Sequence, residues 1–145
     1  MHHLATTKRE GKSVLAEFPD CPGCQTFAGP REDIRQEAAE ALAGWLAGWL
    51  ETALAHGEAP PKPRARAPRH AMAIPVPAPL AVRLLLRWER QEQQLSQADF
   101  GKRLGVSRQQ VNRFESKGAN PTIGSLQRIA ESLGLELEIA FRPAC

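Results

Sequence analysis

Alternating apolar and polar residues near the start of the chain predict three short strands. The clearest alternation covers residues 13–18, a weaker one covers residues 3–8, and residues 25–28 form a third candidate. Glu10 and Gly11 are expected to form the turn between the first two strands, because Gly accepts turn conformations that other residues resist. The beginning of the chain is therefore predicted to form a small sheet.

The spacing changes to a helical one after residue 30, where one long amphipathic helix is predicted. Apolar residues now recur every three or four positions, at Leu42, Trp45, Leu46, Trp49 and Leu54. Pro30, Glu32 and Asp33 suit the first turn of this helix. Gly44 and Gly48 would let its backbone lie close to a sheet or to another helix. We therefore expect a core helix.

Two short helices joined by a tight turn are predicted within residues 95–115. Ser96 can cap a helix whose third residue is Asp99. Ser107 can cap a second helix whose third residue is Gln110. The two helix starts therefore lie only a few turns apart in the sequence.

The same segment separates an apolar face from a polar one. Gly105 suits the left-handed conformation that ends the first helix. The residues able to pack inward are Leu95, Phe100, Leu104, Val106, Val111 and Phe114. The opposite face of the second helix carries Arg108, Gln109, Asn112 and Arg113. Arg pairs with guanine and Gln or Asn with adenine in the major groove, each good pair contributing roughly 1–3 kcal/mol of discrimination. This polar face therefore predicts DNA reading.

Residues 95–134, which include Asn-Pro-Thr at 120–122, resemble the Cro/repressor (Xre-like) helix-turn-helix family. The resemblance implies phosphate contacts from Gln97 and Lys117, and base contacts from the polar face. The residues assigned to DNA are Gln97, Ser107, Arg108, Gln109, Asn112, Arg113 and Lys117. Gly101 stands where the family usually has Ala; it tolerates close helix approach but weakens its helix by roughly 0.5–1 kcal/mol. The alternative is an ordinary helical bundle with a polar surface.

The charge of the chain is divided between its two parts. Residues 1–59 carry five Lys and Arg against nine Asp and Glu, whereas residues 60–145 carry fourteen against seven. A basic second part suits the neutralisation of phosphates. An acidic first part would be repelled by DNA but could attract a basic protein. The sequence therefore implies two partners of opposite charge.

A chain of 145 residues is long enough for two small domains. Repeated prolines in residues 57–79 forbid a helix and favour an extended connection. Within this segment Met72, Ile74 and Val76 alternate as in a short strand, so part of it is expected to belong to the first domain. The predicted domains are therefore residues 1–76 and 77–145.

Residues 17–26 read Glu-Phe-Pro-Asp-Cys-Pro-Gly-Cys-Gln-Thr and are followed by the Ala-rich helix and by Pro-Pro-Lys-Pro. This order, over about residues 11–80, resembles the HicB antitoxin family. The resemblance implies a partial ribonuclease-H-like domain that blocks a small basic HicA-like ribonuclease toxin, joined to a DNA-binding domain that represses the operon of both proteins. Members of the family use a C-terminal domain of either helix-turn-helix or ribbon-helix-helix type.

The toxin contacts implied by this resemblance lie in the loop, at Glu17, Phe18, Pro19, Asp20 and Pro22. The chain departs from the family in its first seven residues, which are less apolar than the usual first strand. It also has Cys21 where an aliphatic residue is more usual. A second interpretation is a stand-alone Xre-family transcriptional regulator with an N-terminal sensing domain.

Cys21 and Cys24 also raise a third interpretation, a thiol oxidoreductase or a zinc site. No second Cys pair completes four zinc ligands, Cys145 is alone, and the four His residues lack ligand spacing to the pair. A packed pair without metal or cofactor is expected. Asp20, Asp33 and Glu37 are too sparse for a ribonuclease-H metal site, so no catalytic residues are assigned and the chain is predicted to be a non-enzyme.

The predicted location is a reducing cytoplasm. The start of the chain lacks the apolar segment of a secretory signal, so free thiols are expected. The uncharged run 41–50 is bounded by Glu40 and Glu51, and it falls far short of the roughly 20 residues that span a membrane. No membrane association is therefore expected.

The last predicted helix runs from Thr122 to Leu133, with Gly134 as its stop. After it, Leu135, Leu137, Ile139 and Phe141 alternate with Glu136, Glu138 and Ala140, as in a half-buried strand. Such a strand could join a sheet of its own chain, or pair with a second copy across a two-fold axis and set two recognition helices ~34 Å apart. The second arrangement predicts a homodimer or higher oligomer.

The fold class predicted from these patterns and resemblances is α+β. A small partial ribonuclease-H-like α/β domain is expected first. An all-α helix-turn-helix domain with a short C-terminal strand is expected to follow. The predicted partners are a HicA-like toxin, operator DNA and a second copy of the chain.

Overall fold

The computed structural model describes residues 1–56, 59–63 and 66–143, with residues 53–56 described by their backbone alone. The predicted inward position of the Leu54 side chain therefore lies outside the described residues. The chain folds as two compact units, of which the first ends at Trp88 and the second begins at Glu89. This division falls inside helix α2 (Ala78–Glu92), whereas the sequence places it before the helix, at residue 76.

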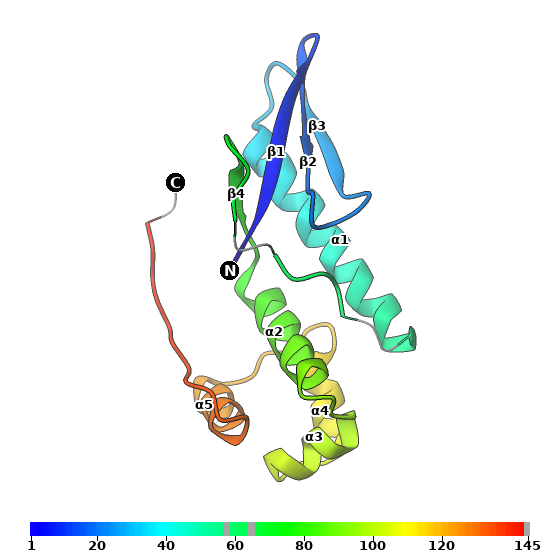
Figure 1. The fold of residues 1–145 in the computed structure, drawn as a ribbon, viewed down its shortest axis with the longest axis vertical. Coiled ribbons are helices and arrows are strands. Elements are labelled where there is room, and N and C mark those ends of the chain that lie inside the picture. Colours follow the sequence, from blue (N-terminus) through cyan, green and yellow to red (C-terminus); the bar gives the residue numbers. More distant parts are fainter. Residues whose placement is uncertain (57–58, 64–65, 144–145) are drawn as a thin grey trace. The chain divides into compact units, whose positions relative to one another are not determined.

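The first unit contains a four-stranded antiparallel sheet with the strand order β3-β2-β1-β4 (Figure 1). Its strands are β1 (His2–Glu10), β2 (Ser13–Glu17), β3 (Gln25–Ala28) and β4 (Met72–Pro75). The three strands predicted near the start of the chain are confirmed. The strand predicted from Met72, Ile74 and Val76 is confirmed at residues 72–75, with Val76 just after its end, and it lies at the edge of the sheet beside β1.

β1 is central to the sheet although its sequence is weakly apolar. Residues 2–5 pair with β4 and residues 6–10 pair with β2, so every residue of β1 has a partner strand on one side. His3 and Ala5 place fully buried side chains in the unit. Gly11 has a φ of +62° in the turn to β2, which confirms the predicted turn. Backbone pairing thus compensates for the few apolar residues of this strand.

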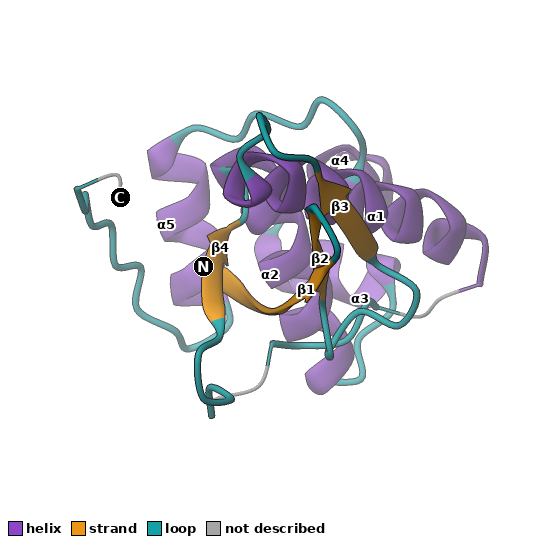
Figure 2. Cartoon of the chain, turned by 90° about the horizontal axis from the view of Figure 1, so that it is seen from above, coloured by secondary structure: helices purple, strands orange, loops and turns teal. Residues whose placement is uncertain are grey.

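Helix α1 (Ile34–His56) lies along one face of the sheet and contacts β2, β3 and β4 (Figures 1 and 2). The leucines that it buries recur at every fourth position, at Leu42, Leu46 and Leu50. Trp45 and Trp49 are half-buried, with ring centroids 5.0 Å apart and planes tilted by 37°. The apolar face predicted from the sequence is therefore the face that closes the core.

The start of α1 differs from the prediction, because the helix begins at Ile34 and Pro30 precedes it. The Asp33 carboxylate accepts a hydrogen bond from a backbone N–H of the first turn at 2.9 Å, as a capping residue does. The Glu32 carboxylate accepts a hydrogen bond from a loop N–H at 2.7 Å. Glu32 and Asp33 therefore stabilise the entry to the helix and do not belong to its first turn.

The two glycines of α1 have no packing role within the described chain. Gly44 and Gly48 are exposed, and a Cβ added at either position would meet no atom within 4 Å. The predicted close approach of a sheet or helix at these residues is wrong. Because Gly in a helix interior costs roughly 0.5–1 kcal/mol relative to Ala, both positions weaken the helix locally.

The proline-rich segment between α1 and β4 is anchored to α2. The Trp88 indole N–H donates a hydrogen bond to the Pro60 carbonyl at 2.6 Å in a buried position, and the Lys62 ammonium lies 5.8 Å from the same ring. Sequence reasoning missed α2 as an element, although its buried Leu80, Leu84 and Trp88 recur at every fourth residue. The connection is therefore held by a helix that follows it in the chain.

Cys21 and Cys24 lie in a tight turn between β2 and β3. The Cys24 N–H donates to the Cys21 carbonyl at 2.8 Å, and Gly23 has a φ of +82°. Both thiols are free and buried. Burial raises the pKa of Cys21 to about 12, with the neighbouring Cys24 and Asp20 adding to the effect, and raises the pKa of Cys24 to about 11. The turn therefore holds neutral, packed thiols.

We expect iodoacetamide to modify these two thiols at least about a hundredfold more slowly in the folded protein than in urea, at about pH 8. The thiolate is the reactive form, and a pKa raised from 9.0 to about 11 or 12 lowers its population by that factor or more. Mass spectrometry of timed samples measures the rate at each cysteine. Similar rates in the two states would contradict the packed arrangement.

The same burial sets a dependence of stability on pH. The folded chain keeps both thiol protons to a higher pH than the unfolded chain does. The stabilisation by the neutral pair is therefore complete below about pH 9 and is lost as the pH rises toward 11 and 12.

The second unit is helical and contains the end of α2, α3 (Gln97–Leu104), α4 (Arg108–Glu115) and α5 (Ile123–Ser132). Its most buried apolar side chains are Phe100, Val111 and Ile129. Thr122 caps α5, and Gly134 follows it with a φ of +72°. The predicted bounds of the last helix are therefore confirmed.

The predicted C-terminal strand is not formed. Residues 135–143 follow α5 as neither helix nor strand (Figure 1). Three apolar residues expected on its buried face are exposed, by 43% at Leu135, 54% at Ile139 and 99% at Phe141. Alternation specifies the two faces of a strand, but a ladder also needs a neighbouring strand. The described residues of the second unit contain no other strand.

Candidate functional site

Helix α3 is delimited by its two caps. The Ser96 hydroxyl accepts a hydrogen bond from the Asp99 N–H at 3.0 Å and donates to the Asp99 carboxylate at 2.6 Å. The hydrogen bond from the Ser96 hydroxyl lowers the pKa of Asp99. At the other end, Gly105 adopts the left-handed conformation with φ 67° and ψ 30°. Both predicted caps are confirmed.

Helix α4 begins with a reciprocal capping box. The Ser107 hydroxyl accepts a hydrogen bond from the Gln110 N–H at 3.2 Å, and the Gln110 side-chain oxygen accepts one from the Ser107 N–H at 3.0 Å. These bonds satisfy backbone donors at the start of the helix. Ser107 is exposed at this helix start, and its predicted contact with DNA stays a prediction.

Gly101 allows the two helices to meet closely. A Cβ added at this residue would lie 2.7 Å from the Val106 carbonyl oxygen and 3.3 Å from the Ser107 carbonyl carbon. Both neighbours are backbone atoms, which cannot rotate away as a flexible side chain would. The Val106 N–H also donates to the Gly101 carbonyl at 2.9 Å. Gly is therefore the residue that fits the turn of this chain.

We expect Gly101→Ala to lower the free energy of unfolding by about 1–3 kcal/mol, because the added methyl group forces backbone atoms apart. Urea denaturation followed by circular dichroism measures this change. The matched control is Gly124→Ala in α5, where an added Cβ would meet no atom within 4 Å. The control should leave stability unchanged or raise it by up to about 1 kcal/mol. The same effect from both variants would contradict the close approach.

A buried ion pair joins α4 to α2. The Arg90 Nε donates to Glu115 Oε1 at 2.6 Å and its Nη2 donates to Oε2 at 3.1 Å. The Glu115 side chain is 1% exposed and the Arg90 side chain is 10% exposed. The Arg90 Nη1 also donates to the Leu95 carbonyl at 3.0 Å. The Arg90 guanidinium therefore holds the end of α4 through Glu115 and the segment that enters α3 through the Leu95 carbonyl.

Sequence reasoning missed this pair. Its signal is the spacing of Glu115, which lies four residues after the buried Val111 and so falls on the inner face of α4. A carboxylate on a buried face requires a cation, because an unpaired buried charge is costly. The spacing does not say which of the many Arg residues supplies it.

Gln97 links α3 to α4. Its amide nitrogen donates to Glu115 Oε2 at 3.1 Å and to Asn112 Oδ1 at 3.4 Å. Gln97 is half-buried. The side chain that is predicted to contact phosphate therefore also donates hydrogen bonds to Asn112 and to Glu115 of the ion pair. The bonds place the oxygen end of the Asn112 amide toward α3.

The outer face of α4 carries polar side chains. The predicted base-reading residues Arg108, Gln109, Asn112 and Arg113 are all exposed on this helix. Lys117, predicted to contact phosphate, is exposed just after the helix. The structure therefore brings the four predicted base-reading residues together on one element whose inner side is fixed by packing.

The family model for helix-turn-helix domains of the Cro/C1 (Xre-like) type matches residues 86–139. These residues are a helix-turn-helix domain. A comparison with curated proteins finds no match to the chain. Domains of this type bind DNA, with the second helix of the motif in the major groove. In this domain that helix is α4.

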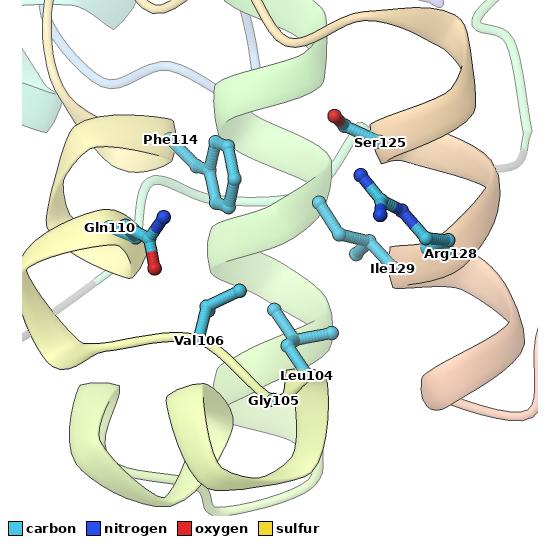
Figure 3. A pocket seen from close by; sticks show the side chains of 8 residues that line it. All are labelled: Leu104, Gly105, Val106, Gln110, Phe114, Ser125, Arg128 and Ile129. Carbon is cyan, nitrogen blue, oxygen red and sulfur yellow. The ribbon is translucent and has the colours of Figure 1, made fainter.

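A cavity of about 260 Å³ opens between the turn of the helix-turn-helix domain and α5. Figure 3 shows Val106, Leu104 and Phe114 on the side of the motif, facing Ile129 of α5. Arg128 and Ser125 line the cavity from α5. The α4 side of this cavity is lined by Gln110 and Phe114, whereas the four predicted base-reading residues lie on the exposed side of the helix.

The loop predicted to contact a toxin lines a second cavity, of about 290 Å³, in the first unit. Its lining includes Glu17, Pro19 and Pro22, which are exposed. Phe18 and Asp20 are buried, so their side chains pack inside the first unit. A contact with a partner would therefore be made mainly by the three exposed residues of this loop.

Residues 1–56, 59–63 and 66–143 hold neither a metal-binding cluster nor a membrane-spanning helix. They contain no group of three or more His, Cys, Asp or Glu side chains placed to hold a metal ion. None of their helices is both long and apolar enough to cross a bilayer.

Proposed function

We propose that this protein is the antitoxin of a type II toxin–antitoxin system and represses its own operon through the helix-turn-helix domain. The toxin is proposed to be a small basic HicA-like ribonuclease that cleaves mRNA. The observation that carries the DNA-binding part of the proposal is the exposed polar face of α4, which is held by a capping box and a buried ion pair.

DNA reading is supported by the chemistry of that face. Arg108 and Arg113 match the acceptors of guanine, and Gln109 and Asn112 match adenine. Gln97 and Lys117 are proposed to contact the phosphates on either side. Preorganisation of α4 by its cap and ion pair reduces the entropy that binding would otherwise cost.

Toxin capture is supported by the first unit. Its strand-strand-strand-helix-strand order is compatible with the small partial ribonuclease-H-like domain that the resemblance to the HicB family implies. Within this unit, residues 1–59 carry nine Asp and Glu against five Lys and Arg, which suits a basic nuclease, whereas residues 60–88 add six Lys and Arg and no acidic residue. Exposed Glu17, Pro19 and Pro22 supply a surface for that contact.

Repression of an operator is proposed to require a homodimer. Two copies related by a two-fold axis would present their α4 helices to successive major grooves, ~34 Å apart. A palindromic operator is the DNA counterpart of that symmetry.

Co-expression with the neighbouring open reading frame, followed by a pull-down and a gel shift on the upstream DNA, tests both activities. A co-purified small basic protein and a shifted upstream fragment are the expected results. Arg108→Ala with Arg113→Ala should lose the shift but keep the captured protein. Glu17→Lys, with α4 unchanged, should keep the shift but lose the captured protein.

Two outcomes contradict parts of the proposal. A shifted upstream fragment without any captured nuclease would leave a stand-alone regulator with an N-terminal sensing domain. Failure to bind the upstream fragment would remove autorepression.

A further inference from the structure

A series of side-chain hydrogen bonds leads from the buried ion pair to the exposed face of α4. The Gln97 side-chain nitrogen donates to Glu115 Oε2 at 3.1 Å and to Asn112 Oδ1 at 3.4 Å. The same Glu115 oxygen accepts a hydrogen bond from Arg90 Nη2 at 3.1 Å. Glu115 is buried, Gln97 is half-buried and Asn112 is exposed. The series therefore passes from the interior of the second unit to its surface.

Glu115 sets the orientation of the Gln97 amide. As a carboxylate paired with Arg90, Glu115 offers hydrogen-bond acceptors and no donor. The Gln97 amide must therefore turn its NH2 group toward Glu115, because its oxygen would leave two acceptors facing each other without a donor. An NH2 group has two hydrogens, and the second one is available for the bond to Asn112.

The orientation of the Asn112 amide follows from that of Gln97. Its oxygen accepts the bond from Gln97, so its NH2 group is the end that remains for solvent or DNA. Turning the amide over would set the NH2 groups of Asn112 and Gln97 against each other and break their bond. An asparagine that can turn pairs with adenine by donating to N7 and accepting from N6. Held in this orientation, Asn112 can only donate to a base.

We propose that Gln97 is a positioning residue that makes Asn112 select a base with an oxygen in the major groove, namely guanine or thymine. Guanine presents the acceptors O6 and N7 and thymine presents O4, whereas the amino groups of adenine and cytosine are donors. The inference rests on the proposed base reading by α4 and narrows it at one position. Because both hydrogens of the Gln97 side chain are used inside the unit, its proposed phosphate contact falls to its backbone N–H in the first turn of α3.

Selection of bound sequences from a library of random duplexes tests this preference without a known operator. Asn112→Ala identifies the position concerned, because it should lose the base preference there. Gln97→Met removes both bonds at a similar side-chain length, so the preference for guanine or thymine over adenine should fall roughly two- to tenfold, as for the loss of one hydrogen bond. Gln127→Met, the same change at an exposed residue of α5, should leave the preference unchanged.

Asn112→Asp tests the direction of the preference. The aspartate keeps an acceptor for Gln97 but presents an oxygen, in place of the NH2 group, to the base. The selected base should therefore change from guanine or thymine to cytosine, whose N4 donates to a carboxylate. Because Asn112 is exposed, this variant tests the orientation without altering the interior of the unit. Guanine or thymine selected as before would overturn the proposal.

A measurement without DNA separates this inference from the proposed function. The side-chain NH2 signals of Gln97 and Asn112 are assigned in NMR spectra of the full-length protein with the Gln97→Met and Asn112→Ala variants. The two bonded hydrogens of Gln97 should exchange with solvent roughly tenfold more slowly than those of Asn112, because two hydrogen bonds must break first. Equal exchange at the two amides, or slower exchange at Asn112, overturns the orientation whatever the DNA result.

Three further outcomes contradict the role in selection. Adenine selected at the Asn112 position by the original protein overturns the preference. An unchanged preference in Gln97→Met overturns the positioning role of Gln97. Slow exchange at Gln97 in a protein that binds no duplex would leave the hydrogen-bond series intact, and it would overturn both the base reading by α4 and the selection that depends on it.

Discussion

Glu115→Ala is expected to lower the free energy of unfolding of the second unit by about 3–5 kcal/mol, the largest effect of any single substitution considered for this protein. The substitution leaves the Arg90 guanidinium largely buried without its carboxylate. It also removes an acceptor from the Gln97 amide, which donates to Glu115 Oε2 at 3.1 Å. Because small domains are only marginally stable, this loss should leave the unit partly unfolded at room temperature.

Urea denaturation followed by circular dichroism measures this loss. The control is the double variant Arg90→Met with Glu115→Leu, which replaces both charges by apolar side chains of similar size. A buried pair replaced in this way is often neutral or stabilising, so the double variant should recover most of the loss. A single variant as stable as the original protein would show that Arg90 finds solvent or another partner when the carboxylate is removed.

Gln109→Ala is expected to weaken binding to the operator by about 1–3 kcal/mol, or roughly ten- to a hundredfold, and to relax the base preference at one position of each half-site. The Gln109 amide is exposed on α4, where it can bond both the donor and the acceptor of adenine. Binding to a random duplex should change little, because phosphate contacts supply most non-specific affinity. Fluorescence anisotropy with operator and random duplexes measures the two affinities.

Lys117→Ala supplies the contrast. It should weaken binding to all duplexes similarly and reduce the slope of log K against log salt by about one, because one phosphate contact is lost. Gln127→Ala on the exposed side of α5 is the matched control and should change neither affinity. Equal losses from Gln109→Ala on operator and random DNA would contradict the assignment of this residue to base reading.

The sequence predicts the elements whose causes are local. Ser96, Ser107 and Gly105 end or begin helices through hydrogen bonds and backbone conformations that involve only a few neighbouring residues. The strands and the apolar face of α1 follow equally from the alternation and recurrence of residues. The exposed face of α4 follows from the same periodicity, so its four polar residues are predicted from sequence and are found exposed.

Contacts between distant residues are beyond such reasoning. The helix start at Ile34 depends on which acceptors the loop before it uses, and the exposure of Gly44 and Gly48 depends on which face of α1 the sheet covers. The strand predicted after Gly134 is not formed because a ladder requires a second strand, and alternation says nothing about where that strand comes from.

The sequence by itself therefore determined the caps, the strands, the apolar face of α1 and the polar face of α4, because each depends on spacing along one segment. Only the tertiary structure decided that Arg90 pairs with Glu115 and that Gln97 joins them to Asn112. Many Arg residues satisfy the pattern equally well. The choice among them is made by packing, which brings one guanidinium within hydrogen-bond distance of one buried carboxylate.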